Sequence, residues 1–297
     1  MAIEPDLRLE AAPQAGGWRR DGRVWVAGAP FYAVVGDPVA HSLSPRLQTA
    51  ALRARGLPHL YGTIHVRSGE LARLKAPGGA PGLAGFNVTA PLKTEAHALC
   101  DQLTPAAQRA GAVNAVRVGA GRWEGHNTDV GGIAGVLSRA WGHDRRADVG
   151  IVLGSGGAAR AAALALLDRG LPRVVIRARS AASVRRCRAW LDDPAAPAPR
   201  VTVELLTDAD PATAGERTIW VVCLAAGVEA APYLPRAATG SRSLVLDLRY
   251  GPALPAADRP ALPWRDGRDV LLEQGALAFA WWFGEPVPRE AMRAALA

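Results

Sequence analysis

The segment VGIVLGSGGAARAAALALLDRGLPRVVI, from Val149 to Ile176, is the strongest indication of how this chain folds. A short apolar run leads through a glycine-rich turn into an alanine- and leucine-rich stretch, and a second apolar run follows. This pattern predicts strand, turn, helix and strand. The turn fits GxGxxG/A with Ala159 last, and such glycines let backbone N–H groups at a helix start approach a pyrophosphate. A glycine-rich turn without a ligand is the alternative.

Three further strand-like runs continue the pattern: Val201 to Leu206, Thr218 to Leu224 and Ser243 to Leu248. With the first unit they predict a doubly wound sheet. The expected cofactor contacts at the turn are Gly154, Ser155, Gly156, Gly157 and Ala158. Roughly 20 residues beyond the turn, an acidic residue would bind a ribose 2′-hydroxyl. Arg177, Arg179 and Ser180 stand there instead, which suits a 2′-phosphate and favours NADP over NAD.

The N-terminal half shows the same alternation. A strand is expected from Tyr32, and a helix with Ser44 as N-cap and Pro45 at its first position is expected to end at Gly56. A strand over residues 59–66, a helix from residue 68 and a strand over residues 85–88 follow. Ligands bind at the carboxyl ends of parallel strands, where Thr89 and Lys93 fall. Residues 1–30 look like an extension with a short hairpin around residues 23–26.

The composition limits the class of protein. With 297 residues, 49% apolar and 21% charged, the chain fits about two globular domains. Its longest nearly unbroken apolar run, Gly275 to Gly284, is shorter than the roughly 20 residues of a membrane-spanning helix, and the acidic N-terminus does not resemble a secretory signal. We expect a cytoplasmic protein without a membrane partner. Cys100, Cys187 and Cys223 are widely spaced, and without zinc-ligand spacing we expect no metal.

The net charge of +8 raises the possibility of a nucleic-acid partner. The basic segment Arg173 to Arg188 contains no acidic residue, but Trp190 is the only aromatic residue near it. The interleaved basic and aromatic residues of a single-strand binding groove are therefore missing. A small phosphorylated ligand explains the cluster better, and a solvated arginine face is the alternative. We expect no nucleic-acid partner.

Lysine is rare in this sequence. Of 35 basic residues, only Lys75 and Lys93 are lysines. Arginine does not release its proton in proteins, whereas a partly buried lysine can exchange a proton near neutral pH. A lysine retained in such a composition is therefore a candidate for proton transfer.

Four short polar segments precede the glycine turn and one follows it. They are HSLSP (41–45), NVTAPLK (87–93), GAVNA (111–115), GHNTD (125–129) and EQGALAF (273–279). In this order they resemble the shikimate dehydrogenase family, from Tyr32 to the C-terminus. The resemblance implies a reversible NADP-dependent reduction of 3-dehydroshikimate to shikimate, with the substrate held between an N-terminal α/β domain and a Rossmann domain.

The resemblance also assigns roles by position. Ser42 and Ser44 match serines that bind the substrate carboxylate. The family's ligands of the ring hydroxyls match Asn87, Thr89, Asn114 and Gln274. Its substrate-side tyrosine matches Tyr250. Lys93 and Asp129 match the catalytic pair.

The chemistry of these residues agrees with that assignment. Oxidation of a secondary alcohol by hydride transfer requires removal of the hydroxyl proton, so one titratable group must lie within hydrogen-bond reach of that oxygen. Lys93 is the candidate, with the carboxylate of Asp129 orienting its ammonium. His126 is a rival proton shuttle, because its ordinary pKa is closer to neutrality. A triol acid also needs neutral donors and acceptors, which Ser, Asn, Thr and Gln provide.

Each of these residues also has a purely structural interpretation. Ser42 and Ser44 could serve as turn and N-cap residues. Asn127 and Asp129 could form an Asx-turn before a helix. Lys93 could be a surface lysine, although a cation at a helix N-terminus opposes the macrodipole.

We therefore expect an α/β fold of two domains. Residues 31–129 with 267–297 form a mainly parallel substrate-binding catalytic domain, and residues 130–266 form a Rossmann-like doubly wound NADP-binding domain after the extension of residues 1–30. The protein is expected to be a monomer or a homodimer.

Several departures from the family pattern leave alternatives open. Gln48 and Thr49 replace the usual His-Asn, which should affect helix packing. The segment Cys223 to Gly227 lacks the Asn and Thr that the family usually carries near the nucleotide, and the loop after Tyr250 lacks the family's threonine. A shikimate-binding pseudoenzyme with a weakened cofactor site is one alternative. A quinate or aminoshikimate dehydrogenase is another, although serine at both carboxylate positions fits shikimate better than the bulkier quinate.

Overall fold

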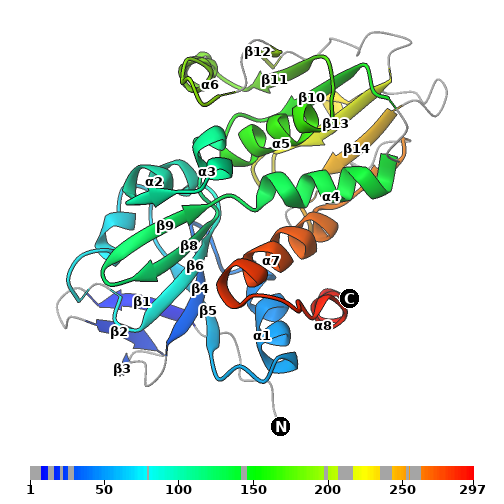
Figure 1. Cartoon of the computed structure of the whole chain (residues 1–297). Helices are drawn as coiled ribbons and strands as arrows, with labels where there is room; N and C mark the ends of the chain where they lie inside the picture. Colours follow the sequence, from blue (N-terminus) through cyan, green and yellow to red (C-terminus); the bar gives the residue numbers. More distant parts are fainter. Residues whose placement is uncertain are drawn as a thin grey trace. The chain divides into compact units, whose positions relative to one another are not determined.

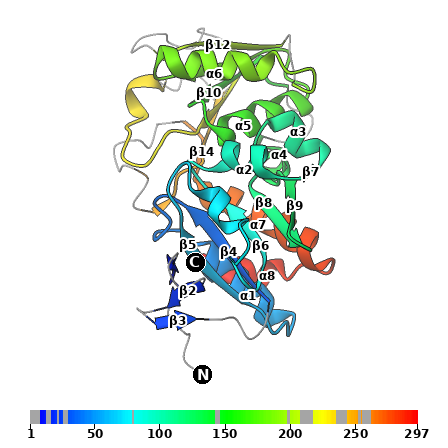
Figure 2. The same ribbon diagram turned by 90° about the vertical axis from the view of Figure 1, so that its left-hand side faces the viewer.

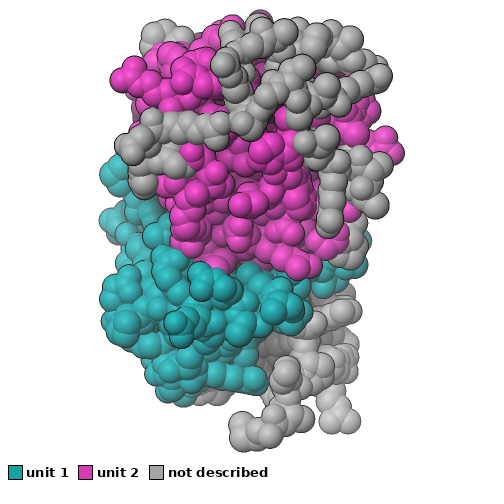
Figure 3. All heavy atoms as spheres, turned by 90° about the vertical axis from the view of Figure 1, so that its right-hand side faces the viewer, with its two compact units in different colours: residues 1–108, 112–128, 275–297 teal, residues 109–111, 129–274 magenta. Residues whose placement is uncertain are grey.

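The computed structural model describes residues 8–12, 17–20, 23–25, 30–78, 80–141, 146–196, 200–206, 217–234, 243–251, 254 and 262–297. The remainder of the expected extension of residues 1–30 lies outside the described residues. The chain divides into two compact units (Figure 3). The first unit comprises residues 1–108, 112–128 and 275–297, and the second comprises residues 109–111 and 129–274.

The first unit is built on a nine-stranded sheet (Figure 1). Its strands are β1 (Arg8–Ala12), β2 (Gly17–Arg20), β3 (Arg23–Trp25), β4 (Phe31–Gly36), β5 (Leu60–His65), β6 (Leu83–Val88), β7 (Gln102–Leu103), β8 (Ala115–Gly119) and β9 (Arg122–His126). Their order is β3-β2-β1-β5-β4-β6-β8-β9-β7. The central strands β1, β5, β4 and β6 are parallel, and hairpins β2–β3 and β8–β9 flank them. The α/β class is confirmed, and the expected N-terminal hairpin is present as β2 and β3.

The core of this unit lies beneath β4 and β6. Phe31, Phe86 and Trp123 are among its largest fully buried side chains. The rings of Phe86 and Trp123 meet edge to face, with centroids 5.0 Å apart. Such a pair adds about 1 kcal/mol to the contribution of its buried area.

The helices of the first unit are short. They are α1 (Ser44–Ala54), the 3-10 helix η1 (Leu71–Leu74), α2 (Lys93–Leu99), α3 (Pro105–Ala110), the end of α7 (Gly267–Phe283) and α8 (Arg289–Ala294). The expected helix from residue 68 is wrong, because only η1 forms there. Gly69 has a left-handed φ of +84°, and the Glu95 carboxylate accepts the backbone N–H groups of Gly69 (2.8 Å) and Leu71 (2.9 Å). These bonds favour a loop over a continuous helix.

Lys75 has a structural role in this unit. Its ammonium donates to the carbonyl of Leu99 (2.7 Å) at the end of α2 and to Oδ1 of Asp101 (2.9 Å). Oδ2 of Asp101 accepts the backbone N–H of Trp123 (2.7 Å). This backbone bond, followed by the bond from Lys75, lowers the pKa of the Asp101 carboxyl. Lys75 thus links α2 to the sheet.

The turn between β8 and β9 holds an alanine in an unfavourable conformation. Gly119 pairs with Arg122, so Ala120 and Gly121 form a two-residue loop with φ of +49° and +74°. Positive φ at both positions is typical of a type I′ turn, for which Asn-Gly is preferred. We expect Ala120→Asn to raise the free energy of unfolding by about 1 kcal/mol, measured by urea denaturation. Ala120→Val should lower it, and equal stability of the two variants would contradict the strain.

The second unit holds a six-stranded parallel sheet. Its strands are β10 (Val149–Leu153), β11 (Val174–Ala178), β12 (Val201–Leu205), β13 (Thr218–Val222), β14 (Ser243–Asp247) and β15 (Trp264–Arg265). Its helices are α4 (Asp129–Trp141), α5 (Gly157–Asp168), α6 (Ala181–Leu191), η2 (Ala231–Tyr233) and the start of α7. The strand order β12-β11-β10-β13-β14-β15 confirms the doubly wound sheet.

The strand order of this sheet reverses at one point. Strands β11 and β12 lie on one side of β10, and β13, β14 and β15 lie on the other, so the reversal falls between β10 and β13. Helix α5 packs against β10 and β11, and α6 packs beside β12 (Figure 2). In doubly wound sheets, ligands bind beyond the carboxyl ends of the strands at this reversal. No described helix is long and apolar enough to span a membrane.

Candidate active site

The carboxyl end of β6 carries three of the predicted site residues. Asn87 lies within β6, and Thr89 follows it, with its backbone N–H donating to the carbonyl of Val35 (2.8 Å). Lys93 is the first residue of α2, and its carbonyl accepts the N–H of Val113 (2.9 Å). The expectation that Thr89 and Lys93 follow the end of a strand is confirmed.

A chain of buried hydrogen bonds joins the two predicted asparagines. The hydroxyl of Tyr61 donates to Oδ1 of Asn87 (2.7 Å), and Nδ2 of Asn87 donates to the carbonyl of Asn114 (3.1 Å). Oδ1 of Asn114 accepts the N–H of Thr128 (2.7 Å), and Nδ2 donates to Oγ1 of Thr128 (2.9 Å). All four residues are buried. These bonds fix which amide edge each asparagine presents, so both can act as oriented partners for hydroxyl groups.

Sequence reasoning missed Tyr61 and Thr128. Tyr61 lies in a strand that was expected, but its bond to Asn87 crosses the sheet from β5. Thr128 lies inside the quoted GHNTD segment, between two residues that were singled out. For Tyr61 the available signal was a polar hydroxyl in a strand, and for Thr128 it was the position between two residues already singled out.

Removal of the Tyr61 hydroxyl should weaken substrate binding. Because that hydroxyl holds Oδ1 of Asn87, we expect Tyr61→Phe to raise KM for the substrate about tenfold, with the cofactor KM unchanged. Steady-state kinetics on the purified variant provide the measurement. The control is Tyr233→Phe, in the second unit. An unchanged substrate KM would show that Asn87 needs no such support.

The two predicted carboxylate ligands lie at the start of α1. The expectation of a Ser44 N-cap is wrong, because α1 already includes Ser44, and its backbone N–H donates to Oγ of Ser42 (3.2 Å). Leu43 is the N-cap instead, and the Ser42 hydroxyl before it accepts the first helical N–H. One turn later, Nε2 of Gln48 donates to the carbonyl of Gly275 (2.9 Å). Gln48 therefore joins α1 to α7 within the first unit.

In the second unit, the glycine turn has the geometry of a phosphate cradle. Gly154 has φ of +122°, and an added Cβ would lie 2.5 Å from the carbonyl oxygen of Cys223. Gly156 is the N-cap of α5, and an added Cβ there would meet no atom within 4 Å. No side chain caps this end, and the first turn carries no acidic residue. The N–H groups at the start of α5 therefore suit an anionic group.

The three residues expected at the 2′-phosphate have different surroundings. Nε of Arg177 pairs with Oε1 of Glu204 on the neighbouring strand (2.8 Å), and its side chain is only 8% exposed. Ser180 is the N-cap of α6 and accepts the N–H of Ser183 (3.2 Å). Arg179 is exposed, so it is the more accessible of the two arginines.

The other predicted substrate and catalytic residues belong to the second unit. Asp129 is the first residue of α4 and is buried. Gln274 lies on α7, where Nε2 donates to the carbonyl of Leu271 (3.0 Å). Tyr250 follows Arg249 beyond β14. Asn87 and Asn114, by contrast, both belong to the first unit.

Comparisons with known proteins identify the family. Residues 34–116 match the model of the shikimate dehydrogenase substrate binding domain, and residues 267–297 match that of the shikimate 5′-dehydrogenase C-terminal domain. A protein of Magnetococcus marinus named shikimate dehydrogenase (NADP(+)) is 36% identical over 87% of this chain and 92% of its own length. The chain belongs to the shikimate dehydrogenase family.

Solved structures of the shikimate dehydrogenase family share the fold. Shikimate 5-dehydrogenase of Thermus thermophilus, solved with NADP(H) and shikimate, is 31% identical and has a TM-score of 0.70 over 90% of this chain and 98% of that one. The Aquifex aeolicus shikimate dehydrogenase is 26% identical and has a TM-score of 0.73 over 92% and 99% of the two chains.

The segment that departs from the shikimate dehydrogenase family forms a tight turn. Ala225 to Gly227 are exposed, Gly227 has φ of +76°, and the N–H of Val228 donates to the carbonyl of Ala225 (3.2 Å). Ala225 to Gly227 carry no polar side chain in place of the family's Asn and Thr. This turn can therefore contact a cofactor only through its backbone N–H and C=O groups.

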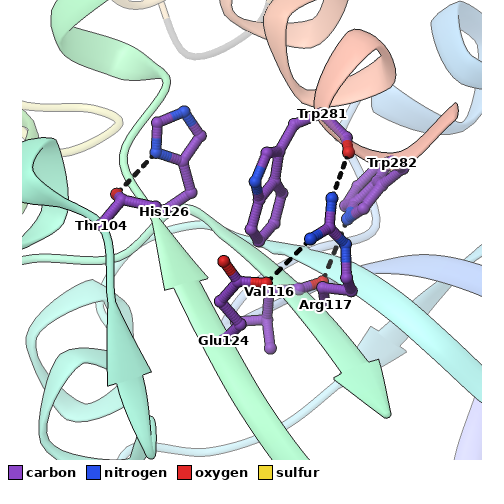
Figure 4. Close-up of polar contacts among 7 residues, drawn as sticks. All are labelled: Thr104, Val116, Arg117, Glu124, His126, Trp281 and Trp282. Atoms are coloured by element: carbon purple, nitrogen blue, oxygen red, sulfur yellow. Dashed lines mark hydrogen bonds and ion pairs between the residues drawn. The ribbon is translucent and has the colours of Figure 1, made fainter. Parts of the chain in front are cut away.

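His126, the rival proton shuttle, belongs to a packed polar cluster (Figure 4). Its Nδ1 lies 2.7 Å from Oγ1 of Thr104, and its ring centroid is 5.2 Å from that of Trp281. Arg117 stacks over Trp281 at 4.5 Å and pairs with Glu124 at 2.8 Å. Burial lowers the pKa of His126, Glu124 raises it and Arg117 lowers it further. The His126 ring is thus held in place by its contacts with Thr104 and Trp281.

The lowered pKa of His126 should make stability depend on pH. Below the ordinary histidine pKa of about 6.5, the unfolded chain takes up a proton that the folded chain resists, so stability falls as the pH drops through that value. His126→Gln should flatten this loss between about pH 7.5 and pH 5, measured by urea denaturation across the range. Parallel curves for variant and wild type would contradict a role for His126.

Proposed function

We propose that this chain is an NADP-dependent shikimate dehydrogenase that reversibly reduces 3-dehydroshikimate to shikimate. The observation that carries the proposal is the oriented amide pair Asn87 and Asn114 at the same edge of the sheet as Lys93, in a chain of this family. A ring with several hydroxyl groups needs such fixed donors and acceptors.

The proposed roles follow the chemistry of each side chain. Ser42 and Ser44 bind the carboxylate. The ring hydroxyls bind Asn87, Thr89, Asn114 and Gln274, and Tyr250 is the substrate-side tyrosine. Lys93 takes the proton from the reacting hydroxyl during oxidation and returns it during reduction, with Asp129 as its carboxylate partner. The bound nicotinamide accepts or supplies the hydride.

The cofactor is proposed to bind at the glycine turn. The N–H groups of Gly156, Gly157 and Ala158 face the pyrophosphate. Arg179 and Ser180 bind the 2′-phosphate. Arg177, which is held by its ion pair with Glu204, supports these two residues. An exposed guanidinium in place of an acidic residue favours NADP over NAD.

We also propose the setting of this activity. Residues 31–129 with 267–297 serve as the substrate-binding catalytic domain, and residues 130–266 serve as the NADP-binding domain. The protein acts in the cytoplasm, in aromatic amino acid biosynthesis through the chorismate pathway, as a monomer or homodimer without nucleic-acid or membrane partners.

The test is NADPH formation by the purified protein with shikimate and NADP⁺. Turnover should fall sharply with NAD⁺ or with quinate in place of the preferred reactant. A preference for quinate would move the chain to the quinate branch of the family. Shikimate binding without any NADP⁺ reduction would instead support a pseudoenzyme.

A further inference from the structure

A buried ion pair lies at the carboxyl end of β14. Arg249 donates three hydrogen bonds to Asp247: from its backbone N to Oδ1 (3.0 Å), from Nε to Oδ1 (2.9 Å) and from Nη2 to Oδ2 (2.7 Å). The two side chains are 5% and 1% exposed. Buried pairs are often no more stabilising than apolar residues of similar volume, so stability alone does not explain this one.

The same guanidinium binds the loop after the neighbouring strand. Nη1 of Arg249 donates to the carbonyl of Val228. Val228 closes the tight turn whose exposed residues are Ala225 to Gly227. Arg249 therefore ties the turn after β13 to the loop after β14.

The backbone of Arg249 anchors a third segment. Its carbonyl accepts the N–H of Gly267 (3.1 Å) at the start of α7. An added Cβ at Gly267 would lie 2.1 Å from the carbonyl oxygen of Leu248, so the two segments meet backbone to backbone. One residue thus fixes three segments of the second unit.

These segments lie at the cofactor edge of the sheet. The N–H of Cys223, at the end of β13, donates to the carbonyl of Leu153 (2.7 Å), immediately before the glycine turn. Between these strand ends the sheet order reverses, which is where a dinucleotide binds. A backbone turn at that place must be held firmly to present its groups to the cofactor.

We propose that Arg249 is a positioning residue for NADP binding. Its bonds to Asp247 and Val228 hold the turn Ala225–Val228 in place at the edge of the sheet where the cofactor binds. The proposal rests on the proposed function. The proposal explains how this turn could bind the cofactor without the family's Asn and Thr: a rigid backbone takes the place of side-chain contacts.

The test compares two arginines of the same sheet. Arg217 makes a similar set of bonds to Asp148, from its backbone N, Nε and Nη2, just before β13 at the amino edge. Arg249→Lys keeps the charge but replaces the fork of nitrogens, which bonds both oxygens of Asp247 and the carbonyl of Val228, with a single nitrogen. Arg217→Lys makes the same change at the opposite edge. We expect Arg249→Lys to raise the Kd for NADP⁺ about tenfold without substrate present, and Arg217→Lys to leave it within about twofold. Arg217→Lys should also leave the shikimate KM unchanged.

A second readout does not depend on the cofactor. Amide hydrogen exchange over residues 223–230 should be faster in Arg249→Lys than in the wild type, and unchanged in Arg217→Lys. Asp247→Asn combined with Arg249→Met removes the buried charges, so it should recover thermal stability without recovering NADP⁺ affinity. Wild-type NADP⁺ affinity in Arg249→Lys and the double variant, or unchanged exchange at the turn, would overturn the proposal. A wild-type protein that binds no NADP⁺ would defeat the proposed function, and the exchange rates would still decide whether Arg249 holds the turn.

Discussion

Lys93→Met is expected to lower kcat about a thousandfold while leaving the Kd for shikimate within about threefold. The thioether occupies a similar volume but cannot exchange a proton. If Lys93 serves only to bind substrate, the loss would appear in KM instead. Rapid-mixing and steady-state kinetics with shikimate and NADP⁺ separate the two cases.

Lys75→Met is the matched control for this experiment. It removes the only other lysine in the sequence and breaks the bonds to Leu99 and Asp101. We expect lower thermal stability and nearly unchanged kcat. Equal losses of kcat in the two variants would show that Lys93, like Lys75, acts through the fold.

Two alanine substitutions in the glycine turn should have opposite signatures. Gly154→Ala places a Cβ 2.5 Å from the carbonyl oxygen of Cys223 at φ of +122°, so it should cost about 3 kcal/mol of folding free energy. Gly156→Ala has an ordinary φ of −82° and open space around its Cβ, so the protein should keep its Tm. That Cβ would, however, stand where we propose that the pyrophosphate approaches the backbone. We expect the Kd for NADP⁺ to rise about a hundredfold.

Calorimetry and NADP⁺ titration of both variants distinguish these effects. Gly156→Ala with wild-type affinity would mean that the turn does not hold the pyrophosphate. Gly154→Ala with wild-type stability would mean that the turn can relax away from β13.

The sequence was most informative where apolar runs were long and bounded by glycine. Strands β10, β13 and β14 are mainly apolar and buried, and α5 begins where the glycines predict. The β8–β9 hairpin was not predicted. Its strands alternate apolar residues with Arg117 and Glu124, which are paired across the hairpin, and its turn uses alanine where the expected residue is asparagine.

From the sequence a candidate site could be proposed as a set of residues, but the hydrogen bonds among them could not be predicted. Spacing placed Thr89 and Lys93 beyond a strand, because the ends of parallel strands have recognisable patterns. The bond from Tyr61 to Asn87 depends on strand pairing between segments 26 positions apart, and a local motif does not contain it. The same holds for Arg249, whose contact with Val228 links loops of different strands.

The scarcity of lysine makes this protein well suited to nuclear magnetic resonance. Labelling lysine side chains with ¹³C at Cε gives signals from Lys75 and Lys93 alone. Lys75 is fastened to a carbonyl and a carboxylate, so its signal serves as an internal reference that should respond little to ligands. The other signal reports the charge on Lys93 directly, and its titration can be followed as substrate and cofactor are added in turn.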